Sequence, residues 1–286
     1  MTAAHPLRNP VGHMAADHPG IVKVGRAGWF AKGLVYVIAG LLALLIAAKA
    51  SGWSKTSSTP SEEASPTGAL KTVAHSTGGP LLLWVLALGM LLYAAWRVVS
   101  ALLPGGTDAK AWAKRIGFAV SAVMYTTFAV TAISLARSKP SNADGNAPVT
   151  SASGGIMQHT GGRLLIGVIG AIVMVVGVYR ISKGAKEDVN DELDLSGLSA
   201  QRLLWTRRIG AIGEIGRGIG IGLVGFFLLR SAVTYDAAQA TGLDGALRRL
   251  AVQSWGLIVV VAVGIGFAAY GVFCLTTFTH RKLEAP

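Results

Sequence analysis

The sequence has few acidic residues, few aromatic residues and a single cysteine, Cys274. One cysteine excludes a disulfide within the chain and a cysteine-rich metal site. Only 14% of the 286 residues are charged, whereas soluble domains contain about 25%. Hydrophobic residues make up 52% of the chain, and the mean hydropathy is positive. This composition argues against a water-soluble protein and indicates a polytopic membrane protein.

Six apolar runs are each about as long as the 17–25 residues that a helix needs to cross the hydrocarbon of a bilayer. No sustained alternation of polar and apolar residues indicates membrane strands instead. The sequence therefore predicts an all-α integral membrane protein whose six spans lie at 27–48, 80–103, 116–136, 164–181, 209–229 and 255–279. The connections 50–79 and 137–162, which are rich in Ser, Thr, Gly and Pro, are predicted to be flexible polar loops.

Lys and Arg outnumber Asp and Glu by 26 to 14, which gives a net charge of +12. Because the basic residues flank the apolar runs, we attribute them to membrane orientation and anionic lipid headgroups, and not to nucleic acid. More of these Lys and Arg residues lie in the segments on the side of the membrane that holds both ends of the chain than in the loops on the opposite side. The positive-inside rule therefore predicts that both termini face the cytoplasm, with residues 1–22 as a flexible cytoplasmic tail.

The apolar runs form an internal repeat. Gly28, Gly117 and Gly213 open the first, third and fifth runs at equivalent positions, and Gly79 aligns with the glycines that open the later second helices. The chain is predicted to be one two-helix unit written three times, at 23–105, 106–183 and 207–286, with a charged cytoplasmic linker at 184–206. An even number of spans per unit gives parallel copies, which permits a six-helix bundle with pseudo-threefold symmetry.

These repeated stretches also carry a family resemblance. It rests on residues 28–36 and 213–221, on the lead-ins 115–117 and 208–210, and on 247–256 with the glycine and tyrosine beyond it. Together they resemble the bacterial membrane proteins of the domain of unknown function 1206 family. The resemblance covers nearly the whole chain after about residue 20. It implies three tandem two-helix units in the bacterial cytoplasmic (inner) membrane, and it implies no activity or site residues.

Small residues predict where the helices pack, because close backbone approach drives helix association in lipid. The fifth run is the richest in glycine, and we expect it to be the most buried, with Gly220→Leu impairing assembly. Flexible gating helices are the alternative use of these glycines. The residues predicted to mediate helix packing are Gly28, Gly33, Gly117, Gly213, Gly216, Gly218, Gly220, Gly222 and Gly225.

Four cations near the ends of spans are the candidate functional residues, namely Lys32, Arg97, Arg180 and Arg217. The simplest interpretation is that each side chain snorkels to lipid phosphate. The alternative is a convergent basic vestibule that binds an anionic headgroup, metabolite or lipid. Glu214 precedes Arg217 by three residues, which predicts an i,i+3 ion pair. We expect no acidic residue deep in a span, and therefore no carboxylate proton relay.

The remaining polar residues favour structural roles. An amphipathic interfacial helix is predicted from about Ser199 to Trp205, running into the fifth span. No metal-binding, phosphate-binding or nucleophile motif is present, so we expect no metal, no cofactor and no catalytic residue. The third run is rich in hydroxyls, which predicts interhelical hydrogen bonds from Ser121, Thr126, Thr127, Thr131 and Ser134.

Two function classes remain, and an enzyme is the least favoured. The first is a structural or accessory subunit that packs with membrane-protein partners, with lipids or with further copies of itself. The second is a carrier or channel for a small or anionic solute along the pseudo-threefold axis. The sequence slightly favours the first class, because it shows no buried charge network that would mark a transport path.

Overall fold

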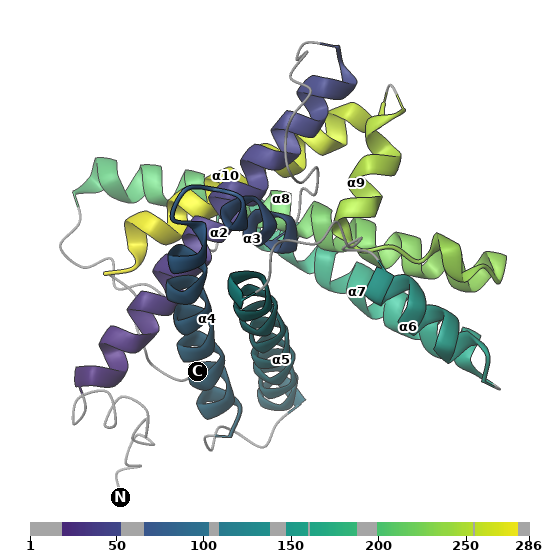
Figure 1. Cartoon of the computed structure of the whole chain (residues 1–286), viewed down its shortest axis with the longest axis horizontal. Helices are drawn as coiled ribbons and strands as arrows, with labels where there is room; N and C mark the ends of the chain where they lie inside the picture. Colours follow the sequence, from purple (N-terminus) through teal and green to yellow (C-terminus); the bar gives the residue numbers. More distant parts are fainter. Residues whose placement is uncertain are drawn as a thin grey trace, which may run out of the picture.

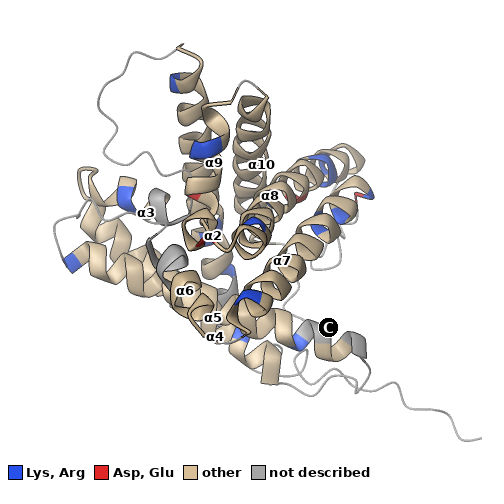
Figure 2. Ribbon diagram, turned by 90° about the vertical axis from the view of Figure 1, so that its right-hand side faces the viewer, with Lys and Arg blue, Asp and Glu red and all other residues tan. Residues whose placement is uncertain are grey.

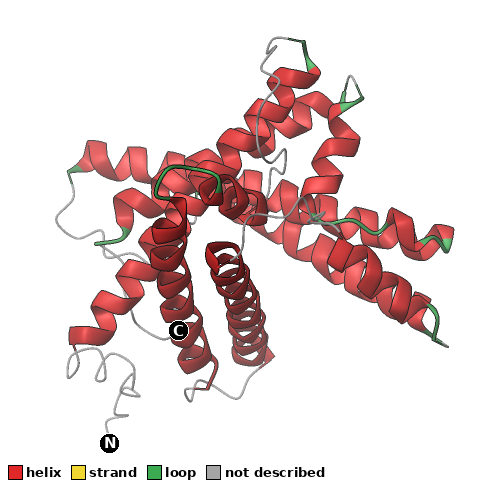
Figure 3. Ribbon diagram, viewed as in Figure 1, coloured by secondary structure: helices red, strands yellow, loops and turns green. Residues whose placement is uncertain are grey.

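The computed structural model describes residues 19–52, 66–102, 109–137, 147–159, 161–187, 199–253 and 255–279, and within these ranges every regular element is helical (Figure 3). The all-α prediction is therefore confirmed. The elements are α2 (Pro19–Ala50), α3 (Pro66–Ala74), α4 (Gly79–Leu102), α5 (Ala109–Arg137), α6 (Ala147–Met157), α7 (Gly162–Ala185), α8 (Ala200–Thr234), the 3-10 helix η1 (Ala237–Gln239), α9 (Leu243–Ala251) and α10 (Gly256–Thr277).

Six of these helices are long and apolar enough to cross a bilayer, so the chain is a multi-pass membrane protein. Charged residues are sparse along them, as Figure 2 shows. Five of the six candidate spans start and end within four residues of the predicted spans. The exception is α8, which begins nine residues earlier than the fifth apolar run. The candidate spans are Arg26–Ala50, Gly79–Leu102, Arg115–Arg137, Gly162–Ala185, Ala200–Thr234 and Gly256–Thr277.

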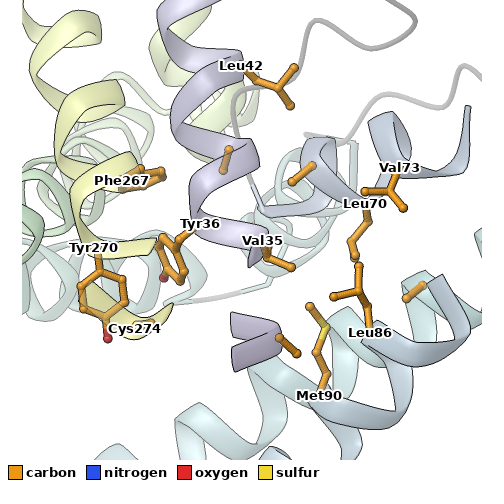
Figure 4. Packing of buried hydrophobic residues seen from close by; sticks show 14 of the residues in the cluster. Val35, Tyr36, Leu42, Leu70, Val73, Leu86, Met90, Phe267, Tyr270 and Cys274 are labelled. Atoms are coloured by element: carbon orange, nitrogen blue, oxygen red, sulfur yellow. The ribbon is translucent and has the colours of Figure 1, made fainter. Parts of the chain in front are cut away.

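A short helix precedes the second long helix of every repeat, so each repeat contains a long helix, a short helix and a second long helix, in that order. The prediction of flexible loops at 50–79 and 137–162 is wrong where these segments are described, because α3 and α6 occupy part of them. Apolar side chains explain the short helices, since Leu70 of α3 and Leu247 of α9 are fully buried. Figure 4 shows Leu70 pointing toward Leu86 of α4.

The turn from the short helix into the long one is the same in all three repeats. A Cβ atom added to Gly79, Gly162 or Gly256 would collide with a carbonyl oxygen of the preceding short helix, so only glycine allows the chain to fold back this closely. The same backbone hydrogen bond closes each turn, from Ser76 N–H to Val73 O, from His159 N–H to Ile156 O and from Gln253 N–H to Leu250 O. Local geometry thus repeats together with the sequence.

The long helices pack most extensively between repeats. α2 lies against α10, α4 against α5, and α7 against α8 (Figure 1). Within repeats, α2 also contacts α4, and α8 contacts α10. Among the described residues, α5 and α7 of the middle repeat make no comparable contact. The pseudo-threefold arrangement stays a prediction, because the middle repeat departs from the other two.

Most of the predicted glycines lie at these helix contacts. Added Cβ atoms at Gly28, Gly33, Gly213, Gly216, Gly218 and Gly225 would each come within 3 Å of an atom in a neighbouring helix, and at Gly220 within 3.2 Å of Leu243. A Cβ atom added to Gly222 would meet no atom within 4 Å. A Cβ atom added to Gly177 of α7, however, would lie 2.7 Å from the backbone nitrogen of Gly222. Gly117 is exposed, with no atom within 4 Å of its added Cβ. The helix-packing interpretation therefore does not hold for Gly117 within one chain.

Burial is greatest in α2, and the expectation that the fifth span is the most buried is wrong. The buried share of the apolar window is 56% for α2 and 44% for α8. The number of neighbouring elements does not account for the difference, because α2 contacts α3, α4, α9 and α10, and α8 contacts α7, η1, α9 and α10. Only 17% of the window in α7 and 22% of that in α5 are buried.

Local hydrogen bonds correct one further expectation. Ser121, Thr126, Thr127 and Thr131 each donate to the carbonyl four residues earlier in α5, so these hydrogen bonds are intrahelical and not interhelical. The predicted tail is shorter than 22 residues, since α2 begins at Pro19, and residues 1–18 lie outside the described ranges.

The helix expected from Ser199 is present, because Ser199 Oγ accepts from the backbone N–H of Arg202 and caps α8. Residues 188–198 of the predicted linker lie outside the described residues.

Candidate functional site

Lys32 of α2 lies inside a group of aromatic rings from four helices. Its Nζ is 4.5 Å from the ring centroid of Trp29, 5.3 Å from Tyr93, 5.6 Å from Tyr125 and 5.2 Å from Tyr270. The lysine is only 5% exposed. Each ring face attracts the ammonium by about 0.5–2 kcal/mol, with the larger values for desolvated pairs. These contacts provide part of the compensation for removing Lys32 from water.

Arg217 of α8 occupies the equivalent place in the third repeat. Its guanidinium carbon lies 4.0 Å from the ring centroid of Tyr270 and 5.3 Å from that of Tyr36. Its Nη1 donates to Oε1 of Glu214 at 2.9 Å, which confirms the predicted i,i+3 ion pair. Figure 4 shows Tyr36 and Tyr270 side by side in the core. Tyr270 therefore lies between Lys32 and Arg217 and contacts both cations.

Glu214 also binds a cation of the preceding repeat. Its Oε2 accepts from Nη1 of Arg180 in α7 at 2.9 Å. Glu214 is 9% exposed and is the only acidic residue within the six candidate spans. The expectation that no acid lies deep in a span is therefore wrong in one respect, because this carboxylate is buried among the helices. It lies there because two guanidinium groups hold its two oxygens.

Arg97 of α4 completes the set on the other side of the cluster. Its Nε and Nη2 donate to the hydroxyl oxygen of Tyr93 at 3.0 Å and 2.6 Å. The guanidinium also stacks on the ring of Phe118 in α5, 4.9 Å from the centroid. Tyr93 therefore presents its ring to Lys32 and its oxygen to Arg97, so one residue links two of the four predicted cations.

The four predicted cations converge, and the snorkelling interpretation is wrong for three of them. Lys32, Arg97 and Arg217 are buried, with exposures of 9% or less, whereas the side chain of Arg180 keeps 32% of its surface exposed. Contacts pass from Tyr125 through Lys32, Tyr270, Arg217 and Glu214 to Arg180. This hub of cations and tyrosines, which we call the cationic cluster, contains residues of all six long helices.

Charge in the cationic cluster is not balanced by the carboxylate that it contains. Four cations meet one glutamate, since Glu214 is the single acid within the spans. Aromatic faces attract a cation but carry no net charge. Three buried atoms of the cluster have no hydrogen-bond partner among the residues that the structure describes, namely Tyr125 Oη, Arg180 Nε and Arg217 Nε. An anion is the chemical species that suits such a site.

Sequence reasoning found the four cations but missed the aromatic residues around them. A signal was available, because Tyr36 and Tyr125 occupy the same place in the first and second repeats. Tyr93 and Tyr270 likewise correspond in the first and third repeats. No group of three His, Cys, Asp or Glu side chains in the described ranges is arranged to hold a metal ion.

Six apolar helices in three equivalent units, joined at a buried cationic cluster, define a multi-pass membrane protein built by internal repetition. The family model of the Domain of Unknown Function (DUF1206) matches three regions, 27–103, 116–187 and 212–277. The chain therefore belongs to the DUF1206 family. The uncharacterized protein YxxB of Bacillus subtilis (strain 168) is 32% identical to it over 268 residues, which cover 93% of each chain. No solved structure matches.

Proposed function

We propose that this protein binds an anionic solute within its six-helix core, as a membrane carrier for that solute. The observation that carries the proposal is the surplus of positive charge in the cationic cluster, in which four cations, three of them buried, accompany one carboxylate. Ionisable groups inside membrane proteins are costly, and they commonly mark a substrate or ion pathway. The sequence disfavoured transport because it showed no buried charge network, and the structure contains one.

An anion would use the groups that the protein leaves unpaired. The hydroxyl of Tyr125 and the Nε–H of Arg217 are buried N–H and O–H donors without an acceptor among the described residues. Charge-assisted hydrogen bonds to an anion are about twice as strong as neutral ones. The bound charge would also offset the repulsion among Lys32, Arg97 and Arg217, so binding and bundle stability are expected to rise together.

The test is the effect of soluble anions on thermal unfolding of the purified protein in neutral detergent. Phosphate, sulfate, chloride and acetate are compared as sodium salts at equal ionic strength. A ligand at 100 times its Kd stabilises a protein by about 2.7 kcal/mol. We expect at least one anion to raise the unfolding temperature of the wild type and to do so much less for the Lys32→Gln/Arg217→Gln variant. Equal responses of both proteins would contradict the proposal.

The Lys32→Gln/Arg217→Gln variant needs a partner experiment, because it removes cation–π contacts and part of an ion pair. Tyr125→Phe removes only a hydroxyl oxygen that has no hydrogen-bond partner among the described residues. It should fold like the wild type and show a weaker anion response. The matched control is Tyr179→Phe, since Tyr179 is 64% exposed on α7. A Tyr125→Phe protein with an undiminished anion response would count against the site.

We propose further that the protein lies in the bacterial cytoplasmic membrane with both termini in the cytoplasm. The excess of Lys and Arg on the terminal side supports this orientation. It would place Arg97 and Arg180, near the ends of α4 and α7, toward the inner leaflet. Cysteine labelling with a membrane-impermeant maleimide tests the orientation, because a cysteine at position 284 should be protected in intact cells and labelled after lysis.

The second candidate is the accessory role with a membrane-protein partner. It is favoured by the middle repeat, in which the apolar windows of α5 and α7 are the least buried of the six. Solubilisation in a mild detergent, followed by affinity purification from native membranes, tests it. A stoichiometric membrane protein that is lost after a polar substitution such as Val175→Ser, where the side chain is 68% exposed, would support this role over the carrier.

A further inference from the structure

A glycine of the first long helix packs directly against a tyrosine of the second in two of the three repeats. A Cβ atom added to Gly28 would lie 2.6 Å from Tyr93 Cβ, and one added to Gly213 would lie 2.7 Å from Tyr270 Cα. The equivalent glycine of the middle repeat, Gly117, would meet nothing within 4 Å. In the described part of the chain, α5 and α7 therefore leave open a side that the other repeats close.

Bulkier side chains of the middle repeat account for this open side. In the first repeat, a Cβ atom added to Gly89 would lie 2.8 Å from the Cβ of Ala31. Repeat alignment puts Ile172 in place of Gly89 and Val120 in place of Ala31. Helices approach closely in lipid only where small residues face each other. Ile172 is 58% exposed and Val120 is 62% exposed, so neither side chain is covered by the other helix. These two larger residues in place of Gly89 and Ala31 therefore account for the separation of α5 and α7.

The two helices beside the open side both contribute polar groups to the cationic cluster. The hydroxyl oxygen of Tyr125 in α5 is buried and has no hydrogen-bond partner in the described ranges. The same is true of the Nε atom of Arg180 in α7. The side chain of Arg180 is also the most exposed of the four cations, at 32%. Both helices beside the open side therefore contribute to the cluster, and the most exposed of its four cations lies on one of them.

We infer that an anionic phospholipid occupies this open side, with its phosphate at Arg180 and Tyr125 and an acyl chain along α7. This inference rests on the proposed anion binding and names the class of ligand. A free solute needs no apolar walls, whereas the exposed walls of α5 and α7 are apolar. A neutral lipid has no net charge to offset the surplus of positive charge in the cluster, and an anionic one does.

The spacing of residues on α7 suits such a lipid. Ile172, Val176 and Arg180 follow one another at intervals of four, so they lie along one face of the helix. Ile172 and Val176 are 58% and 40% exposed. Arg180 lies about 12 Å farther along the axis than Ile172, at a rise of about 1.5 Å per residue. The cation is five residues from the end of α7, or about 7.5 Å along the axis, so it lies near one end of the span.

Native mass spectrometry of the whole protein tests the inference. The protein is released from vesicles that contain phosphatidylcholine and phosphatidylglycerol in equal parts, and the retained lipids are counted. We expect the wild type to retain phosphatidylglycerol selectively and Arg180→Gln to bind it about tenfold more weakly, which corresponds to about 1.4 kcal/mol. Tyr125→Phe should lower retention as well. Arg230→Gln is the matched control, because Arg230 is exposed on α8 and forms no ion pair among the described residues.

The competing occupants give distinct results. Soluble glycerol 3-phosphate is tested in the thermal-unfolding assay, because it has the phosphate without acyl chains. Stabilisation by glycerol 3-phosphate together with unselective lipid retention would overturn the lipid and leave anion binding intact. A lack of response to any anion and to phosphatidylglycerol would overturn both. Equal retention of phosphatidylglycerol by wild type and Arg180→Gln, or a copurifying protein that excludes it, would also contradict the inference.

Discussion

Arg180 and Glu214 form an ion pair at 2.9 Å although 34 residues separate them in the sequence. The pair joins α7 of the second repeat to α8 of the third, and Glu214 binds Arg217 of its own helix at the same time. One carboxylate therefore connects two repeats and holds one end of the cationic cluster. Breaking a buried pair is costly, because it leaves the remaining charge uncompensated.

Glu214→Gln should be the most destabilising single change in the cationic cluster. It leaves Arg217 buried and Arg180 without its carboxylate, and loss of one partner of a buried ion pair costs about 3–5 kcal/mol. Denaturant unfolding in mixed detergent and lipid micelles measures the effect. Glu187→Gln, at an exposed position beyond α7, is the control and should be neutral. A Glu214→Gln protein as stable as the control would contradict the buried network.

Glycine substitutions should separate close helix contacts from open positions. Gly216→Ala places a methyl group on the Cα of Gly266 in α10, where the backbone must move, so we expect a loss of about 2–5 kcal/mol in the free energy of unfolding. Gly220→Ala should cost less, because its Cβ would face the side chains of Leu243 and Phe267 at 3.2 Å and 3.3 Å.

The control for these substitutions is Gly117→Ala. No atom lies within 4 Å of the added Cβ, and alanine favours a helix by about 1 kcal/mol over glycine. The variant should therefore be neutral or slightly more stable than the wild type. A strong loss of stability at Gly117, or none at Gly216, would show that the described helix contacts are not those of the native bundle.

Two tyrosine-to-phenylalanine variants should act in opposite directions in buffer without a bound anion. Tyr93→Phe removes the oxygen that accepts two hydrogen bonds from Arg97, and hydrogen bonds to charged groups contribute about 1.5–3 kcal/mol each. Tyr125→Phe removes an oxygen without a partner among the described residues, so stability should stay equal or rise. The free energy of unfolding of each variant decides this, and a Tyr125→Phe protein as unstable as Tyr93→Phe would contradict the assignment.

The turn after α8 should respond to acid. The side-chain amide of Gln239 and the backbone N–H of Ala238 both donate to Asp236 and lower the pKa of its carboxyl group. A lowered pKa in the folded state means that the charged form stabilises the turn above the ordinary pKa of Asp, about 3.9. The contribution is lost as the pH falls through the lowered value.

Amide hydrogen exchange at Ala238 measures this loss. Protection should be constant from neutral pH down to about pH 4 and should decrease below it. Asp236→Asn keeps one carbonyl acceptor but removes the charge, so its protection should be weaker at neutral pH and insensitive to acid. Protection that falls between pH 8 and 6 would point to another group.

Much of the fold follows from the sequence for simple physical reasons. Span length and hydropathy predict six helices, because each span must satisfy its own backbone hydrogen bonds in lipid. The pair of Glu214 and Arg217 follows from helical spacing alone. The short helices α3, α6 and α9 were missed because their Ser-, Thr- and Gly-rich surroundings resemble loops, although Leu70 and Leu247 carry the apolar signal for burial.

The cationic cluster could be predicted only in part. Its cations were visible as charges within apolar runs, but their burial depends on which helices meet, and α2 packs on α10 at the far end of the chain. The ion pair of Arg180 and Glu214 is likewise a tertiary contact. Repetition of tyrosine at positions 36 and 125, and at 93 and 270, was the one available sign that rings would gather around Lys32.

The central claim is that the cationic cluster holds an anion, and anomalous X-ray diffraction tests it most directly. Crystals grown in the presence of bromide, whose absorption edge allows its unambiguous location, should show an anomalous peak within hydrogen-bonding distance of Tyr125 Oη or Arg217 Nε. The peak should vanish in Lys32→Gln/Arg217→Gln crystals. Fully occupied density for protein atoms and water around Lys32, with no anomalous signal there, would contradict the account.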